Sequence, residues 1–498
     1  MSTDFMSRAT PTIRIVYKHW GNRDVVVEEL KKALENRDKV VEFWRRKRQQ
    51  IETSLAQYAG TLADILVSAY KSGDLEATKE AAYEYFSRTK YGNRKLVKML
   101  LPEASDTLQH RRGAMLKFSR LPLLTCPGAD VCGAHCYALH GHYSKEMVKE
   151  SIMRQDAFVK LLIDEVKKRV GDNPALAAGL VGAALAGAVE AAGRASVVRL
   201  HDAGDVNDPI YAAAWMAAAK LLPDRRFYTY TKTFPNVVVR VWEDAVQYYR
   251  RLFGEPPPKN FAVNISATST NFQLLPKAAE EFAKLGIQTP GVFFYAPATM
   301  ALYYRGEDWQ RLAEGLVEAA KRTVGKKLIL EIEHGLGHPR NAKSASNLLQ
   351  AVEEVVNYAQ SAGIPLKIVV PTTAYREDGS IDTEKTNALR ELTHTIAAKG
   401  LPHTSSEEAR WTKRAGDRDH TLSREVVVFE VSGAGEPVEV FVEPGSEKAC
   451  TICRRCIEAH YSPQREAFKI RLMPTIAETL LPTTTTAQRR KRKKAVAT

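Results

Sequence analysis

Residues 195–233, "ASVVRLHDAGDVNDPIYAAAWMAAAKLLPDRRFYTYTKT", contain one complete strand–helix–strand unit. The runs at 195–206 and 225–233 are apolar and of strand length, and the Ala-rich stretch between them, 208–222, is long enough for a helix. Two strands joined through a helix usually pair in parallel, with a right-handed crossover. The unit therefore predicts an α/β fold.

The same unit recurs along the chain. Helical patterns separate further strand-like runs, which lie at 114–121, 260–268, 290–298, 326–335 and 366–375. The helical patterns lie at 145–170, 274–285, 306–323 and 342–362. Repeated strand–helix units imply a parallel sheet, either open or curled into a barrel. So many strands favour a full or partial (β/α) barrel over a small doubly wound domain.

The flanking regions have a different composition. Charged helical patterns fill most of the N-terminal part, with breaks expected at Gly60 and at 71–74, after a short strand candidate at 12–20. A hairpin is expected at 424–444, with its turn at "SGAGEP". The sequence thus predicts four regions: an N-terminal helical region (1–111), a barrel-like domain (112–400), a small cysteine-rich C-terminal β element (401–480) and a basic disordered tail (481–498).

Charge and hydropathy limit the classes of partner. The net charge of +14 favours an acidic partner, most often nucleic acid, although a merely solubilising surface has the same composition. Six consecutive basic residues at 489–494 could hold phosphates non-specifically. The first residues lack an apolar run, and the apolar stretch 174–193 is Ala- and Gly-rich, typical of a tightly packed helix. We therefore expect a cytoplasmic protein without a membrane span.

Polar residues follow the predicted strands at their carboxyl ends. His201, Asp202 and Asp205 follow one strand, Lys232 ends the next, and Ser266 ends a third. Glu331, Glu333 and His334 close a later strand. Chemistry in parallel α/β folds is found at this edge of the sheet. These residues therefore predict one polar site.

All six cysteines fall into two triads, one at Cys126, Cys132 and Cys136 and the other at Cys450, Cys453 and Cys456. In a reducing compartment, clustered cysteines hold metals more often than they form disulfides, the alternative being buried structural thiols. Iron–sulfur clusters are held by thiolates, whereas zinc also accepts imidazole. His140 and His460 each lie four residues after a triad, so zinc is a serious rival.

Two features favour an iron–sulfur cluster, and a 4Fe-4S cluster in particular. The spacing Cys450-x2-Cys453-x2-Cys456 equals that of the first three ligands of bacterial ferredoxins. The first triad follows the first strand of the series, at the expected mouth of the barrel. A cluster held there by three thiolates leaves one iron open to a cofactor or substrate.

The stretch "SRLPLLTCPGADVCGAHCYALHGHY" (119–143) resembles a phage- and plasmid-borne domain family called gene product eighty-eight. Its members pair a "CPG…C…CYA" element with "H-x-x-GD" and "Y-x-T-[KR]". The counterparts here are His201 to Asp205 and, with one residue fewer, Tyr230 to Lys232. The resemblance spans roughly 112–275 and the terminal cysteines. Some members carry the label of rolling-circle replication initiator.

A wider resemblance is to radical S-adenosylmethionine enzymes, in the branch of spore photoproduct lyase. It rests on the order of the first cysteine triad, Gly204-Asp205, Thr231-Lys232 and 266–268. The resemblance implies a cluster on the thiolates whose open iron binds S-adenosylmethionine, with His201 also near the cofactor. Asp205 would accept from its ammonium group, Gly204 would let the backbone approach, and Lys232 and Ser266 would meet its oxygens. The triad has five and three intervening residues, where that superfamily usually has three and two.

Each site residue also has a plainer interpretation. Asp205 could cap the helix that starts near 207–209, and Glu331 and Glu333 could balance interior cations such as Arg199. "HGHY" (140–143) lacks the strand context of a replication-nuclease metal site. The aromatic residues of 225–233 suit core packing as well as base stacking. No catalytic residue is assigned.

The sequence therefore favours an iron–sulfur, radical-enzyme-like protein of a mobile element, acting on or near nucleic acid. The alternative is a zinc-stabilised DNA- or RNA-binding protein of phage or plasmid replication.

Overall fold

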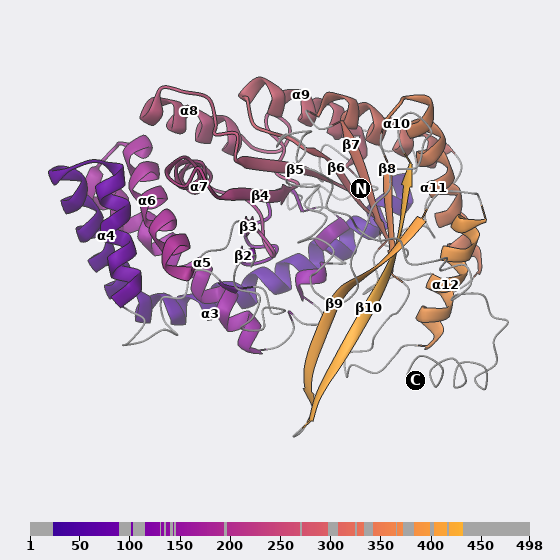
Figure 1. Cartoon of the computed structure of the whole chain (residues 1–498), viewed down its shortest axis with the longest axis horizontal. Helices are drawn as coiled ribbons and strands as arrows, with labels where there is room; N and C mark the ends of the chain where they lie inside the picture. The colour runs from indigo at the N-terminus through magenta and orange to yellow at the C-terminus, as the bar shows by residue number, and fades with distance from the viewer. Residues whose placement is uncertain are drawn as a thin grey trace, which may run out of the picture.

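Figure 1 shows the computed structural model of the chain, in which an arc of helices covers a fan of strands. It describes residues 23–88, 101–102, 115–129, 131–133, 136–139, 143, 146–193, 197–268, 271–296, 307–323, 326–332, 342–364, 366–371, 383–398, 403–415 and 418–431.

The described strands form one mixed sheet in the order β1-β2-β3-β4-β5-β6-β7-β8-β10-β9. They are β1 (Leu101–Pro102), β2 (Met115–Phe118), β3 (Val197–Leu200), β4 (Arg226–Thr231), β5 (Phe261–Ala267), β6 (Gly291–Ala296), β7 (Lys327–Ile332), β8 (Leu366–Pro371), β9 (His403–Ala415) and β10 (Arg418–Val431). From β2 to β8 every neighbouring pair is parallel. The predicted α/β fold with a parallel sheet is confirmed.

The strand order also bears on the predicted barrel. Parallel strands that follow one another in chain order, joined by right-handed crossovers, carry their helices on one face, whether the sheet stays open or curls into a barrel. Among the described residues no pairing joins β2 to β8, and β10 pairs with the free edge of β8 in antiparallel fashion. A closed barrel is therefore not confirmed.

The helices between the strands lie close to their expected places. They are α5 (Glu146–Val170), α6 (Pro174–Ala192), α7 (Pro209–Leu221), α8 (Val241–Phe253), α9 (Leu275–Leu285), α10 (Glu307–Arg322), α11 (Ala342–Ser361) and α12 (Thr383–Ala397). The core lies between them and the sheet, where the indole of Trp215 on α7 packs edge-on against Phe118 of β2. Helices α8 and α12 were not expected from the sequence.

The N-terminal region contains one long helix, α3 (Arg23–Ser72), and a short one, α4 (Leu75–Arg88). The break expected at Gly60 is wrong, since α3 runs through it. The break at 71–74 is confirmed, because Asp74 accepts hydrogen bonds from the backbone N–H groups of Glu76 and Ala77 and so starts α4. In Figure 1, α3 is a long rod that runs below β2, β3 and β4.

Helix α6 is apolar and long enough to cross a membrane, but 83% of its most apolar window is buried inside the structure. It packs between α4 and α7, and its Ala- and Gly-rich sequence lets these neighbours approach closely. The prediction of a tightly packed core helix is confirmed.

The hairpin predicted at 424–444 is corrected in part. Residues 424–431 belong to β10, which pairs with β9 on one side and with β8 on the other. The hairpin partner of β10 is therefore β9, which precedes it in the chain, and not the segment after it. The predicted second arm lies outside the described residues. So do the strand candidate at 12–20, the second cysteine triad, Glu333, His334 and the basic run at 489–494.

Candidate functional site

The first cysteine triad lies in the loop that follows β2, at the carboxyl edge of the sheet. Backbone bonds hold this loop beside the loop after β3: Arg120 N donates to the carbonyl of Ala203 at 2.7 Å, and Asp202 N donates to that of Phe118 at 3.3 Å. Two short 3-10 turns, Val131–Gly133 and Tyr137–Leu139, carry the chain past Cys132 and Cys136. The cysteine loop thus packs on the strand ends.

The three thiols are reduced and close enough to influence one another. Burial, together with the charges of Asp205 and Cys132, raises the pKa of Cys126 to about 12. A hydrogen bond with Cys132, burial, and the charges of Cys132 and Cys126 raise the pKa of Cys136 well above its ordinary value. Three sulfurs from different turns of the loop therefore share one site, in which negative charge on one opposes negative charge on the others.

Two glycines bring three strand-end loops into backbone contact. A Cβ on Gly128 would lie 2.0 Å from the carbonyl oxygen of Lys232, so only glycine fits where the cysteine loop meets the end of β4. Gly204 has a φ of 81°, and its Cβ would lie 2.5 Å from the Cβ of Arg120. The "CPG" and "GD" elements are therefore positions of close approach between neighbouring loops.

Asp205 is buried and connects the loop after β3 to the end of β4. Its carboxylate accepts from the hydroxyl of Thr231 at 2.7 Å and from the backbone N–H groups of Lys232 at 2.8 Å and Val206 at 2.7 Å. Burial raises its pKa, and these donors oppose that rise. The alternative in which Asp205 caps the next helix is wrong, since Asp208 caps α7 by accepting from Tyr211 N at 2.8 Å.

Lys232 and Ser266 lie beside this carboxylate. The ammonium group of Lys232 donates to the hydroxyl of Ser266, at 3.1 Å, across the ends of β4 and β5. Its positive charge also reaches Cys126, whose pKa it lowers against the larger effect of burial. The structure therefore brings the first triad, Asp205, Lys232 and Ser266 together at one edge of the sheet.

His201 lies among the same loops, but both of its ring nitrogens are engaged. Nδ1 is 2.6 Å from the hydroxyl of Thr229 on β4, and Nε2 is 2.8 Å from that of Tyr211 on α7. Burial, and next the charge of Arg120, lowers its pKa to about 3, so the ring is neutral. A direct role for His201 toward a cofactor stays a prediction.

Asp202 is the centre of a second polar group on this edge. It lies 3.3 Å from the ammonium of Lys117 and 3.2 Å from the guanidinium of Arg199, and it accepts from the hydroxyl of Tyr143 at 2.6 Å. Burial favours the neutral acid, but the two cations hold the pKa of Asp202 below its ordinary range. Arg199 is thus paired with Asp202, and the side chain of Glu331 lies outside the described residues.

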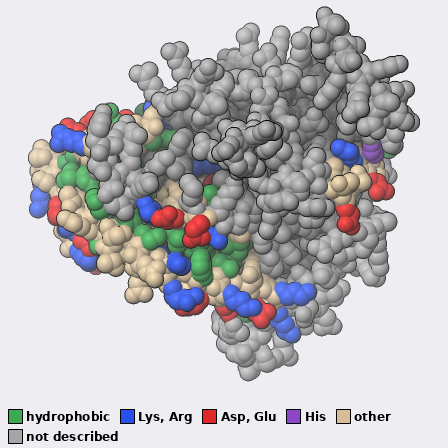
Figure 2. Space-filling view, turned by 90° about the horizontal axis from the view of Figure 1, so that it is seen from below, with side chains coloured by type: hydrophobic (Ala, Val, Ile, Leu, Met, Phe, Trp, Pro, Cys, Tyr) green, Lys and Arg blue, Asp and Glu red, His purple; other side chains and the backbone are tan. Residues whose placement is uncertain are grey.

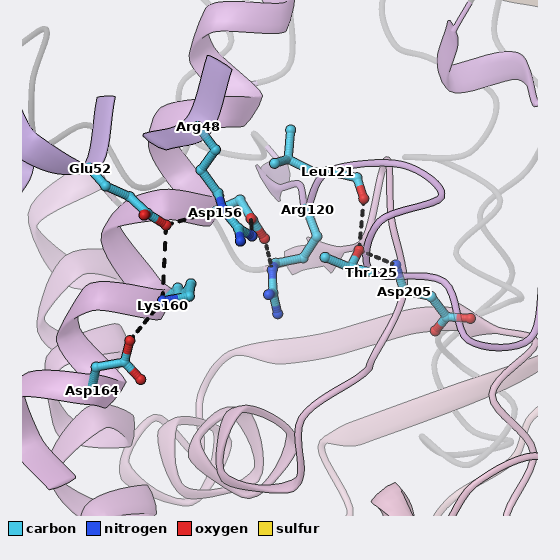
Figure 3. Close-up of polar contacts among 9 residues, drawn as sticks. All are labelled: Arg48, Glu52, Arg120, Leu121, Thr125, Asp156, Lys160, Asp164 and Asp205. Atoms are coloured by element: carbon cyan, nitrogen blue, oxygen red, sulfur yellow. Dashed lines mark hydrogen bonds and ion pairs between the residues drawn. The ribbon is translucent and has the colours of Figure 1, made fainter. Parts of the chain in front are cut away.

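The cysteine loop is also held to helices α3 and α5 (Figure 3). The fully buried carboxylate of Asp156, on α5, pairs with Arg120 of the cysteine loop and lies 3.1 Å from the guanidinium of Arg48 on α3. On the other side, the hydroxyl of Thr125 donates to the carbonyl of Leu121 at 2.9 Å and accepts from Asp205 N at 3.3 Å. Buried ion pairs and hydrogen bonds therefore run from α3 to Asp205.

The donor set fits a thiophilic metal in kind. Cysteine thiolates are ligands of both iron–sulfur clusters and zinc, so three neighbouring thiols could supply three of the ligands of either. Within the described ranges, however, no group of three or more His, Cys, Asp or Glu side chains is arranged to hold a metal ion. Cys126, Cys132 and Cys136 would have to draw closer together on binding. The second triad lies outside the described residues.

Comparison with known families bears on the same region. Residues 86–295 match the family described as Gene product 88. The matched range contains β2 to β5, the first triad, Gly204, Asp205, Lys232 and Ser266. It supports the first of the two resemblances, whereas the likeness to radical S-adenosylmethionine enzymes stays a prediction. Searches of curated proteins and of solved structures returned no match.

Sequence reasoning did not single out Thr125, Arg120 or Asp156. The one sequence signal for Thr125 is its place directly before Cys126, next to the loop that it connects to Asp205. The Arg120–Asp156 pair joins residues 36 positions apart on different elements, and no local pattern announces such a contact.

Proposed function

We propose that this chain is an iron–sulfur protein in which Cys126, Cys132 and Cys136 hold a cluster at the carboxyl edge of the sheet. The observation that carries the proposal is the placement of the three thiols in one loop packed on the strand ends, where Cys132 and Cys136 share a hydrogen bond and Gly128 touches Lys232. A thiol must lose its proton to bind metal, and a bound cation would offset the burial and the mutual repulsion that raise the pKa values of these thiols.

The polar residues beside the triad support a small-molecule site. A cluster held by three thiolates supplies electron transfer and one iron that the protein does not occupy. Lys232 and Ser266 present an ammonium and a hydroxyl there, while Asp205 offers a carboxylate whose position Thr231 fixes. Such a set suits a ligand with both amino and carboxylate groups, of which S-adenosylmethionine is the first to test.

Zinc is the rival metal, because three thiolates and one further ligand also make a closed structural site. Metal analysis distinguishes the two. Protein purified without oxygen is expected to be brown and to contain iron and acid-labile sulfide. Colourless protein with zinc and no sulfide would contradict the iron–sulfur proposal and support the zinc alternative.

A second measurement tests the cofactor separately. Protein reduced with dithionite and mixed with S-adenosylmethionine is expected to release methionine and 5′-deoxyadenosine, the dithionite supplying the electron that breaks the C5′–S bond and a C–H group of the protein or buffer supplying the hydrogen atom that the adenosyl group takes up. The Ser266→Ala variant, which loses the hydroxyl and keeps the thiols and the Lys232 ammonium, should retain its iron and release less product. If the protein is brown but does not cleave S-adenosylmethionine, the cofactor proposal is contradicted, and the cluster would serve electron transfer or a structural role.

We also propose nucleic acid as the partner, on the grounds of charge. The chain carries a net charge of +14. Figure 2 shows basic and acidic side chains interspersed over the described part of one face, so the excess positive charge does not gather there. The basic run at 489–494 is therefore the first segment to test.

A further inference from the structure

Helix α3 lies against the cysteine loop, although it is outside the range that matches the family. The match begins at residue 86, whereas α3 ends at Ser72. The residues of α3 that contact the loop, or the residues that hold the loop, follow one another at intervals of three or four, which places them in one stripe along the helix. They are Ala33, Asn36, Val40, Trp44 and Arg48. An element separate from the matched domain therefore forms one wall of the thiol site.

The closest contacts of this stripe are with Gly133, the residue directly after Cys132. The side-chain amide of Asn36 donates to the carbonyl of Gly133 at 2.6 Å. A Cβ on Gly133 would lie 3.1 Å from the carbonyl oxygen of Ala33, so the loop backbone lies directly on the helix. Gly133 ends the 3-10 turn Val131–Gly133, which also contains Cys132. The contacts of α3 with Gly133 therefore bear directly on the position of that thiol.

The hydrogen bond from Asn36 fixes this turn from outside the loop. The last carbonyls of a helical turn have no partner within the turn itself, so their donors come from elsewhere. Asn36 is 97 residues away from Gly133 in the sequence and donates from a long helix. A hydrogen bond sets both the distance and the direction of the peptide group that accepts it. The amide of Asn36 therefore holds the backbone of the Cys132 turn in place.

The next turns of α3 hold the helix to the same loop without Asn36. Trp44 is 3% exposed and belongs to one apolar cluster with Leu123 and Cys136. One turn beyond Trp44, Arg48 lies 3.1 Å from the carboxylate of the buried Asp156, which also pairs with the cysteine loop (Figure 3). We therefore expect α3 to stay docked when the amide of Asn36 is removed, so that the effect of this amide can be measured by itself.

We propose that Asn36 is a positioning residue of the thiol site, whose hydrogen bond to Gly133 holds Cys132 where it can bind a metal together with Cys126 and Cys136. The inference rests on the proposed function, because it requires that the triad bind metal. A helix outside the matched range thus sets the metal affinity of a loop inside it, as hydrogen bonds to the surroundings of metal ligands do in general.

The test is a titration of the reduced full-length chain with Co²⁺ alone, followed through the thiolate-to-cobalt absorption band. Cys450→Ser, Cys453→Ser and Cys456→Ser are introduced in every variant, so that the first triad supplies the only thiols. Asn36→Ala is expected to lower the Co²⁺ affinity about 10- to 100-fold. Alanine favours a helix more than asparagine does, so a weaker α3 would not explain this loss.

Two further variants separate the hydrogen bond from packing. Asn36→Gln keeps an amide donor and should restore part of the Co²⁺ affinity, whereas Asn36→Leu fills the space without a donor and should bind as weakly as Asn36→Ala. A role in packing alone predicts the reverse order. Equal affinities of Asn36→Gln and Asn36→Leu would therefore overturn the proposed hydrogen bond.

Gln50→Ala is the matched control, because Gln50 is an exposed amide residue on the same helix. It should bind Co²⁺ as the parent does, and a loss equal to that of Asn36→Ala would contradict a specific role of Asn36. Equal affinity of the parent and Asn36→Ala would overturn the role of Asn36 and leave the proposed function standing. A parent without any thiolate-to-cobalt band would overturn the proposed function itself, and the role of Asn36 with it.

Discussion

At the scale of single residues, the site depends on close backbone contact at two glycines. Gly128 and Gly204 lie where the loops after β2, β3 and β4 touch, and each would meet a neighbouring atom closer than 3.0 Å if it carried a Cβ. The sequence marks both positions, since each belongs to a short motif. It does not show that Lys232 is the neighbour of Gly128, because that contact joins residues about a hundred positions apart.

Gly128→Ala is expected to destabilise the fold by about 1–3 kcal/mol and to lower the metal content, because the carbonyl of Lys232 must move. Urea unfolding and metal analysis measure the two effects. Gly60→Ala, within α3, is the matched control. A Cβ on Gly60 would lie 3.8 Å from its nearest neighbour, a guanidinium nitrogen of Arg169, and alanine should stabilise the helix by up to about 1 kcal/mol. Unchanged stability of Gly128→Ala would contradict the backbone contact.

His201 predicts a pH dependence. Its pKa in the folded chain is about 3, below its ordinary 6.5, so the unfolded chain binds a proton that the folded chain does not. Stability should therefore fall as the pH falls from about 6.5 toward 3, by up to about 1.4 kcal/mol per pH unit from this residue.

Urea unfolding between pH 7 and pH 5 checks this slope. His201→Gln should flatten it, whatever its effect on stability at pH 7, and His394→Gln on α12 controls for the loss of a histidine elsewhere. An equal slope in His201→Gln and the parent would show that the ring is not held neutral.

At the scale of elements, the strand–helix alternation was predictable because apolar runs of strand length alternate with helical patterns. Helix α8 was missed although its signals were present. It has Glu243 and Asp244 in its first turn, Arg250 and Arg251 in its last, and Gly254 in a left-handed conformation at its end. The stretch "NVVVRVW" (236–242), which runs into the start of α8, is rich in β-branched residues and resembles a strand, so these helix signals were not recognised. The continuity of α3 through Gly60 was missed because one glycine is tolerated where packing holds a helix on both sides.

The ion pairs between elements give a third prediction. Asp156→Asn leaves Arg48 and the buried Arg120 without their shared carboxylate, which should cost about 3–5 kcal/mol. Asp164→Asn, about two turns further along α5, removes a half-exposed partner of Lys160 and should cost no more than about 1 kcal/mol. Urea unfolding compares the two. Similar losses in both variants would show that the buried pairs do not hold α3 and α5 to the cysteine loop.

At the scale of the whole molecule, the sequence indicated which residues end the strands, and the sheet brings Asp205, Lys232 and Ser266 to one edge with the first triad. The covering helix could not be predicted, because the stripe from Ala33 to Trp44 looks like any amphipathic helix face until its partner is known. The same limit applies to barrel closure, which depends on contacts between the first and last strands of the sheet and not on any local pattern.

The charge of the whole molecule gives a fourth prediction. Binding to double-stranded DNA should weaken steeply as salt rises, and changing residues 489–494 to glutamine should lower the slope of log affinity against log salt by up to about 5. The matched control changes six exposed residues of α3 instead: Lys31, Lys32, Lys39, Arg45, Arg46 and Lys47. Binding that does not depend on salt, or an equal loss in both variants, would contradict the role of the basic run.

The most direct test of the account is the iron and acid-labile sulfide content of a chain whose only cysteines are Cys126, Cys132 and Cys136, purified without oxygen. The account predicts about four irons and four sulfides per chain, lost when these three cysteines are also changed to serine. Neither iron nor sulfide in the first protein, with all three thiols open to alkylation, would contradict it.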